Sequence, residues 1–257
     1  MKLLKNLSIL TLTAAISYGC SSSDSGTTAT PSPNNIYSGT ITGGATALNG
    51  IEEKGIFYNN RLLVLSRKAD GIDQLFDINL TTTNLSLTGT GTVYDGSSIF
   101  LTNLDYDGSF VDNISTTLNF TDAGTISYPP GTLNLITSTT LMTKGSATSK
   151  LIGSWSGGFG GGFFGQMNLT IDATGTITAG GDQAPLDCVF TGTITPADTN
   201  INVYNAAITS DGGTALNCTM PAGAYTGLAW TEGDTDGTLV LMFADGLKGR
   251  AVILTRN

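Results

Sequence analysis

The chain has 257 residues, of which 20 are Asp or Glu, 11 are Lys or Arg and none is His. An acidic chain without a basic patch argues against nucleic-acid binding, because phosphate contacts need clustered Lys and Arg. Without histidine, neither a Ser-His-Asp nor a Cys-His triad can form and the commonest general base is missing, so we predict no catalytic residues.

The N-terminus has the pattern of an export signal. A short basic start precedes the apolar stretch 7–16, which is shorter than the roughly 20 apolar residues of a membrane-spanning helix. The next residues, Ser17-Tyr18-Gly19-Cys20, resemble the lipobox of bacterial lipoproteins, although leucine is more common at the position of Ser17. The resemblance implies that residues 1–19 are removed and that acyl chains on Cys20 hold the protein on a membrane. The alternative is an ordinary signal peptide cut nearby, with Cys20 incidental.

The residues after the cysteine predict a location and a tether. Lipoproteins with a serine directly after the lipidated cysteine usually go to the outer membrane, and Ser21 stands there. We therefore expect an outer-membrane lipoprotein that touches the membrane through acyl chains, on either its periplasmic or its surface face. Residues 20–36 are mostly Ser, Thr, Pro, Gly and Asn, a composition that predicts a lipidated, disordered tether.

The remaining cysteines predict a disulfide. Assigning Cys20 to lipid leaves Cys188 and Cys218 as an even pair in an oxidising compartment. In the chain-entropy model, closing a loop of this size stabilises a fold by roughly 3–4 kcal/mol. The alternative is two separate buried thiols. Two cysteines without histidine fall short of a zinc site.

Beyond the tether the chain has a β pattern throughout. Short runs in which apolar residues alternate with Thr, Ser and Asn are separated by Gly, Asp and Asn, and no stretch has a useful helical periodicity. We predict an all-β fold of two small antiparallel lobes, an N-terminal lobe over 37–141 and a C-terminal lobe over 151–257. The polar segment 142–150 is the predicted linker, and the strand count of the N-terminal lobe stays open.

The pattern of the C-terminal lobe predicts an eight-stranded up-and-down barrel. Turn signals separate its apolar runs, and a closed barrel removes the exposed edges that short strands would leave in an open sheet. The predicted strands are 151–157, 165–172, 175–180, 187–195, 201–209, 224–231, 237–243 and 249–255.

The first predicted strand of this lobe contains Gly153-Ser154-Trp155, followed by a Gly-rich turn and a hairpin. A Gly-x-Trp strand with such a hairpin resembles the calycins, the superfamily of lipocalins and avidins. In those folds a basic residue near the last strand packs over the first-strand tryptophan. Closing the barrel would set the start of the last strand beside the end of the first, which assigns this role to Arg250 rather than Arg256. With only Trp155 and Trp230 in the chain, biotin binding is not implied.

Four aromatic residues are the predicted contacts for a ligand or a protein partner. The stretch 157–165 includes a Gly-x-Gly-x-x-Gly match, but a strand rather than a helix follows it, so we do not interpret it as a dinucleotide site. It forms either a flap that closes on an apolar ligand or partner, or a loop whose phenylalanines cap the barrel. Trp230 alternates onto the same strand face as Leu228, where it is either barrel core or cavity wall. The candidate contact residues are Phe159, Phe163, Phe164 and Trp230.

Two acidic segments, 103–108 and 232–237, imitate the first half of a calcium-binding loop. Such a loop needs a bidentate carboxylate at position 12, and Ile114 and Phe243 stand there instead. Asp-Gly turns explain both segments, so we predict no metal site and no cofactor. The same carboxylates would need desolvation to act as glycosidase acids, and turn residues are seldom desolvated.

The expected function is binding without catalysis. Tether, fold class and missing catalytic groups favour an envelope lipoprotein that binds a small apolar ligand in its C-terminal barrel or a protein partner at its lobes. The overall arrangement also resembles Gram-negative surface lipoproteins that bind host proteins. The alternatives are a structural or surface-coat lipoprotein and, third, a carboxylate-only hydrolase. An apolar cavity in the barrel would favour a small ligand, and a filled barrel with an exposed apolar patch would favour a protein partner.

Overall fold

The structure is a computed structural model that describes residues 31–43, 52–67, 73–95, 100–123, 128–158, 166–182, 188–213 and 220–257. The predicted signal peptide and Cys20 lie outside these ranges. Strands dominate the described chain, which confirms the predicted all-β fold class. Within these ranges, helix is confined to the short α1 (Thr139–Met142) and the 3₁₀ helix η2 (Thr148–Lys150). Neither described helix is long and apolar enough to cross a membrane.

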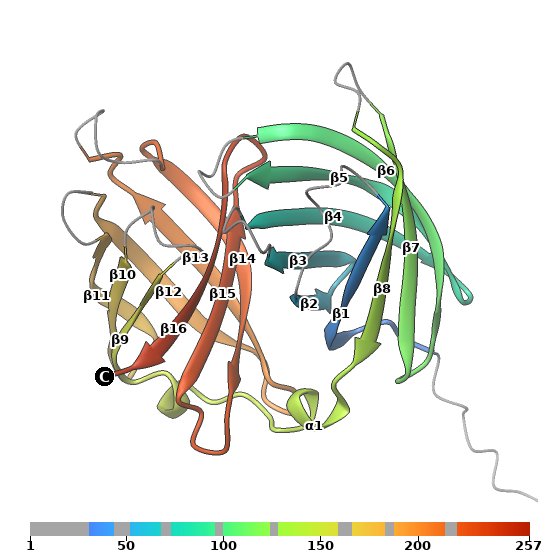
Figure 1. The fold of residues 1–257 in the computed structure, drawn as a ribbon. Helices are drawn as coiled ribbons and strands as arrows, with labels where there is room; N and C mark the ends of the chain where they lie inside the picture. Colours follow the sequence, from blue (N-terminus) through green and yellow to red (C-terminus); the bar gives the residue numbers. More distant parts are fainter. Residues whose placement is uncertain are drawn as a thin grey trace, which may run out of the picture. The chain divides into compact units, whose positions relative to one another are not determined.

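The N-terminal strands close a barrel, because each strand pairs with the next and β8 returns to β1 (Figure 1). These strands are β1 (Asn35–Gly43), β2 (Glu52–Tyr58), β3 (Arg61–Arg67), β4 (Gln74–Thr83), β5 (Ser86–Asp95), β6 (Phe100–Val111), β7 (Ser115–Asp122) and β8 (Gly131–Thr137). Asn59 and Asn60 both have positive φ, as a tight two-residue hairpin turn requires. β1 starts before the predicted lobe boundary at 37, and the buried Ile36 shows that the end of the predicted tether belongs to the fold.

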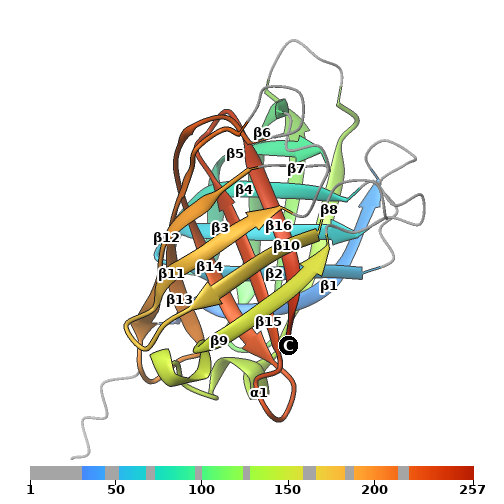
Figure 2. The same ribbon diagram turned by 90° about the vertical axis from the view of Figure 1, so that its left-hand side faces the viewer.

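The C-terminal strands close a second up-and-down barrel, in which β16 pairs with β9 (Figure 2). Its strands are β9 (Gly153–Gly158), β10 (Gln166–Ile171), β11 (Thr176–Asp182), β12 (Phe190–Asp198), β13 (Val203–Ser210), β14 (Gly223–Glu232), β15 (Thr238–Ala244) and β16 (Gly249–Arg256). Each overlaps a predicted strand, so the predicted eight-stranded barrel is confirmed. Local turn chemistry explains this agreement. Asp172, for example, accepts backbone hydrogen bonds from Thr174 and Thr176, and Gly175 between them has positive φ.

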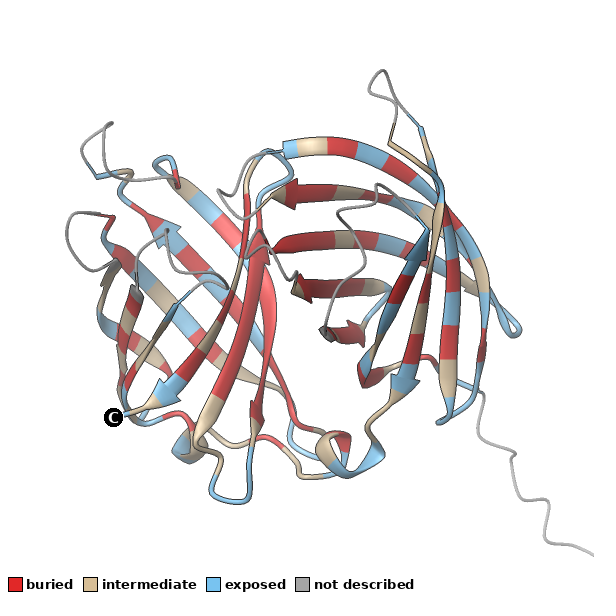
Figure 3. Ribbon diagram, in the orientation of Figure 1, coloured by how far each residue is buried: buried red, intermediate tan, exposed pale blue. Residues whose placement is uncertain are grey.

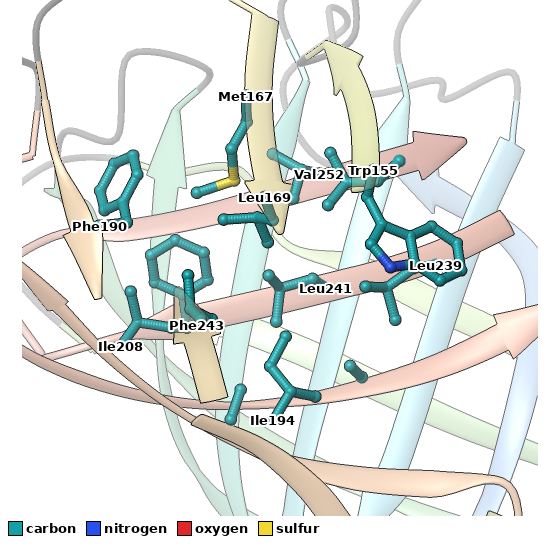
Figure 4. Packing of buried hydrophobic residues seen from close by; sticks show 14 of the residues in the cluster. Trp155, Met167, Leu169, Phe190, Ile194, Ile208, Leu239, Leu241, Phe243 and Val252 are labelled. Atoms are coloured by element: carbon teal, nitrogen blue, oxygen red, sulfur yellow. The ribbon is translucent and has the colours of Figure 1, made fainter. Parts of the chain in front are cut away.

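Apolar side chains pack the interior of both barrels over the residues that the structure describes. Every second residue of a strand points inward, so an alternating sequence places an apolar row inside each barrel. In the C-terminal barrel the interior cluster includes Trp155, Phe190 and Phe243, each 0% exposed (Figure 4). The N-terminal barrel is packed in the same way around Phe76 and Phe120, whose ring centroids are 6.1 Å apart. Burial of each large apolar side chain contributes roughly 1.5–3 kcal/mol.

A third apolar cluster lies between the two barrels. It is built from outward-facing side chains, mainly of β2–β5 in one barrel and of β14 and β15 in the other. β15 is buried on both faces over 239–244, as expected for a continuous apolar run (Figure 3). The buried members are Ile36, Ile56, Leu63, Leu65, Leu75, Tyr94, Met142, Val203, Leu228, Trp230, Val240, Met242 and Ala244. The lobes therefore share a core and belong to one compact unit, Pro31–Asn257.

The predicted linker 142–150 is bound to the C-terminal barrel. Met142 is buried, and its carbonyl oxygen accepts a hydrogen bond from the backbone N–H of Asn202 at 2.9 Å. The hydroxyl of Ser146 donates to the carbonyl oxygen of Asp198 at 2.8 Å. The connection is therefore part of the fold and not only a spacer between lobes.

Asp236, in the turn between β14 and β15, holds two lysines of this connection. Lys144 Nζ lies 2.6 Å from Asp236 Oδ1, and Lys150 Nζ lies 3.6 Å from Oδ2. Partial burial raises the pKa of Asp236, but the hydrogen bonds that it accepts from Lys144 and Thr231 outweigh burial, so its pKa is lowered overall. The carboxylate therefore favours its charged form in the folded protein.

Candidate functional site

Trp155 and Arg256 meet where β9 and β16 close the C-terminal barrel. The Trp155 ring is buried, and its Nε1 donates to the carbonyl oxygen of Leu151 at 2.7 Å. The guanidinium carbon of Arg256 lies 4.5 Å from the centroid of the ring. Arg256 Nη1 donates to the carbonyl oxygen of Ile152 at 3.0 Å, and Nη2 donates to that of Lys150. The last strand therefore supplies the basic residue that the calycin resemblance implies over the tryptophan.

The prediction that Arg250 fills this role is wrong. The guanidinium of Arg250 lies over the ring of Phe190, 5.4 Å from its centroid. Arg256, not Arg250, pairs with Trp155, because Trp155 stands near the start of β9 and therefore faces the end of its antiparallel partner. Gly153, the other residue of the motif, begins β9 with a φ of +126°, a conformation that favours glycine.

Trp230 lies on the outer face of β14, in the shared core rather than inside its barrel. It is 0% exposed, and its Nε1 donates to Glu232 Oε1 at 2.9 Å. Lys54 of β2 donates to both oxygens of the same carboxylate, at 2.9 and 2.8 Å. The predicted ligand or partner contact at Trp230 is therefore wrong, because the N-terminal barrel covers this face. The continuous apolar run at 239–244 was the sequence signal that this side of the barrel is covered.

Cys188 is buried in the C-terminal barrel, whereas Cys218 lies outside the described residues. Phe190 pairs with Ser210 across β12 and β13, and the Ser210 hydroxyl donates to the carbonyl oxygen of Met220 at 3.0 Å. Cys188 and Met220 also belong to the same buried cluster. These contacts place Cys188 in the same cluster as Met220, two residues after Cys218 in the sequence, and the bridge itself stays a prediction. Other predicted residues outside the described ranges are Cys20, Phe159, Phe163 and Phe164.

The two acidic segments differ in structure. Segment 232–237 joins β14 to β15 as a turn in which Asp236 has positive φ. Segment 103–108 is not a turn, so that interpretation is wrong: it lies inside β6, which pairs with β5 and β7 on its two sides. Asp105 and Asp107 are exposed on the outer face of this strand, where neither carboxylate is desolvated.

Exposed aliphatic side chains gather at one end of the N-terminal barrel. They are Leu85 (47% exposed), Val111 (53%), Ile114 (60%) and Ile136 (63%), and we call these four residues the aliphatic rim. The backbone N–H of Phe110 donates to the carbonyl oxygen of Leu85 at 3.0 Å, and that of Thr137 donates to the carbonyl oxygen of Ile114 at 2.9 Å. Sequence reasoning missed the rim, because its members are separate in the sequence and meet only when strands β5 to β8 pair in register.

The first described residues run beside the aliphatic rim. The backbone N–H of Ser32 donates at 3.3 Å to Oδ1 of Asp112, which lies in the same turn as Ile114. The amide Nδ2 of Asn35 donates at 3.5 Å to Oδ1 of Asn113 in that turn. The rim and the start of β1 therefore lie at the same end of the barrel.

The part of the chain that supplies the rim is acidic. Residues 69–143 contain eight Asp and no Glu, Lys or Arg. Two of these carboxylates, on Asp105 and Asp107, lie on the outer face of β6, the same face from which Val111 projects. A third, on Asp112, lies in the β6–β7 turn of the rim, whereas Asp77 is paired with Arg61 and Asp95 ends β5 away from the rim.

Two cavities lie on outer faces of the described barrels. One, of about 350 Å³, lies between the β2–β3 hairpin and strands β12–β14. The other, of about 380 Å³, lies on the outer face of β4–β6 and is lined by Asn79, Thr92 and Asn103 among others. Neither cavity is lined by the large apolar side chains that fill the barrel interiors.

Comparison with known proteins adds little. No protein-family model matches the chain, and no curated protein matches it. One similar solved structure is immune modulator A of Aeromonas veronii, with 9% identity, a TM-score of 0.35, and coverage of 87% of this chain and 94% of that one. Another is the isotype 1 transferrin binding protein B of serogroup B Neisseria meningitidis, with 11% identity, a TM-score of 0.29, and coverage of 80% and 58%. TM-scores this low carry no argument about function.

Proposed function

We propose that this chain is a non-enzymatic outer-membrane lipoprotein that binds a protein partner through the aliphatic rim. The observation that carries the proposal is the exposure of four aliphatic side chains at one end of the N-terminal barrel. Neighbouring exposed apolar side chains on a soluble surface commonly mark a protein interface, because a partner that covers them removes their area from water.

The packing of the barrels disfavours a small apolar ligand. Large side chains fill both described interiors, so the space that a lipocalin-like ligand would need is occupied. The rim likewise disfavours a purely structural coat protein, which has no need for a group of neighbouring aliphatic side chains exposed to water. A carboxylate-only hydrolase finds no support at Asp105 and Asp107, whose exposure keeps them hydrated.

The charge near the aliphatic rim indicates the kind of partner. Asp112 in the turn of the rim, with Asp105 and Asp107 on the outer face of β6, favours a partner that carries Lys or Arg next to an apolar patch. The aliphatic contacts would supply affinity, at about 25 cal/mol per Å² of apolar surface buried. The charges would mainly accelerate association, and their effect would weaken as salt screens them.

The lipobox-like run at Cys20 supports anchoring, and Ser21 supports the outer membrane. Between Cys20 and Ser32, residues 21–31 can extend at most about 40 Å, given about 3.6 Å per residue. A tether of that reach leaves room for a partner between the membrane and the rim.

Site-specific photo-cross-linking tests the proposal. A benzophenone amino acid replaces Ile114 or, as a matched control, Leu247, an aliphatic residue 73% exposed in the β15–β16 turn. Irradiation of intact producing cells, with and without the fluids that surround them, should give a discrete protein adduct from position 114 and not from 247. Adding Val111→Ser and Ile136→Ser should abolish the adduct while the thermal melt stays unchanged. No adduct at 114, or the same adducts at both positions, would contradict partner binding at the rim.

A further inference from the structure

The cleft between the two barrels has the size and lining of a binding site. Its volume of about 350 Å³ falls in the range of small-molecule sites. One wall is the β2–β3 hairpin, with Tyr58, Asn59 and Arg61, and the other is the outer face of β12–β14. None of these elements supplies a residue of the aliphatic rim, so the cleft is a separate feature.

The β12–β14 wall presents a grid of hydroxyl and amide groups. Ile194 and Ala206 point into the barrel, so their neighbours along β12 and β13 point outward into the cleft. Thr195 pairs directly with Asn205, which places their side chains next to each other. A second row, through Ala207, brings a threonine from β12 and one from β14 into line. Hydroxyl and amide groups both donate and accept hydrogen bonds.

On the opposite wall, formed by the β2–β3 hairpin, the positive charge of Arg61 is balanced by a carboxylate. Arg61 Nε and Nη2 donate to the two carboxylate oxygens of Asp77, each at 2.8 Å, in a bidentate pair. Arg61 Nη1 donates to Thr226 Oγ1 at 3.1 Å, which links the two barrels at the cleft. An anion bound here would meet the Asp77 carboxylate behind the guanidinium. A purely apolar ligand would leave the hydroxyl and amide groups of the other wall without partners.

We infer that this cleft binds a neutral carbohydrate. A sugar carries hydroxyl groups that donate and accept, as the Thr195 and Asn205 side chains require, and it carries no charge for Arg61 or Asp77 to oppose. Its C–H face can lie against the ring of Tyr58, the aromatic side chain of the cleft lining. The inference goes beyond partner binding at the rim and does not depend on it.

Isothermal titration and ligand-observed NMR test the inference on the soluble chain that starts at Ser21, which contains the whole compact unit 31–257. The probes are glucose, galactose, N-acetylglucosamine and lactose, with inorganic phosphate and octanoate as an anionic and an apolar comparison. At least one sugar should bind with a Kd of about 1 mM or tighter. Asn205→Ala and the near-isosteric Thr195→Val should each weaken binding about tenfold, whereas Asn168→Ala, on the outer face of β10, should leave it unchanged.

Melting curves of each variant should match that of the wild type, which would show that the fold is kept. The inference is overturned if none of the sugars binds, if phosphate or octanoate binds in their place, or if both cleft variants bind as the wild type does. The rim variants of the cross-linking experiment should bind the sugar normally, so failure of one proposal is distinguishable from failure of the other.

Discussion

Arg256 lies over the ring of Trp155 at the seam where the last strand of the C-terminal barrel meets the first. Arg256→Ala should lower the free energy of unfolding by about 2–4 kcal/mol, because it removes a cation–π contact and hydrogen bonds to three carbonyl oxygens. Urea denaturation followed by tryptophan fluorescence measures this loss. Arg67→Ala is the control, since Arg67 is 41% exposed and 3.8 Å from Asp73, and it should cost about 0.5 kcal/mol or less. Equal losses would show that the seam contact is unimportant.

Trp230→Ala should destabilise the chain by about 3–5 kcal/mol, because the ring is wholly buried in the core that the two barrels share. Removing it should also loosen one barrel from the other, and limited proteolysis of the segment between β8 and β9 should accelerate. Leu247→Ala, at an exposed turn, is the control and should have almost no effect. A Trp230→Ala protein as stable and as protease-resistant as the wild type would argue against a shared core.

Acid should weaken the contacts of Asp236. Its pKa is lowered in the folded state, so its charged form stabilises the fold above the unfolded-state pKa of about 3.9, and this stabilisation is lost as the pH falls through the folded-state pKa. Asp236→Asn should therefore cost about 1 kcal/mol at neutral pH and progressively less below about pH 4. Denaturation curves at several pH values measure the difference, with the exposed Asp234→Asn as the control. A cost that does not change with pH would mean that charge is not the cause.

Oxidised protein should carry no free thiol at Cys188 or Cys218. Intact mass under denaturing, non-reducing conditions should rise by two hydrogen atoms on reduction, and Cys218→Ser should lower stability by roughly 3 kcal/mol. Both cysteines reacting with a thiol reagent before reduction would rule out the bridge.

Cys20→Ser should release the protein from the membrane, because several acyl chains on one residue supply the anchor and the charge of the chain does not favour anionic lipid. Fractionation of cells that produce the variant should find folded protein in the soluble fraction. A variant that stays firmly in the membrane fraction would contradict lipid anchoring at this residue.

Local sequence patterns were sufficient for the fold class and for the strands of the C-terminal barrel. Alternating apolar residues and Asp-Gly turns act over a few neighbours, so the hairpins around Asp172 and Asp236 could be placed without knowledge of the rest of the chain. The same patterns failed at 103–108, where an Asp-Gly pair lies inside a strand because both neighbouring strands hold it there.

Contacts between distant segments needed the tertiary structure. Whether Arg250 or Arg256 covers Trp155 depends on the register of β16 against β9. The composition of the two strands does not reveal which residue of one lies opposite which residue of the other. The sequence places Trp230 on one face of a strand, but the N-terminal barrel decides that this face is covered. The aliphatic rim combines residues of two turns and two strands that meet only when β5 to β8 pair in register. Strand periodicity is a local property of the backbone, whereas burial and exposure depend on which surfaces pack together.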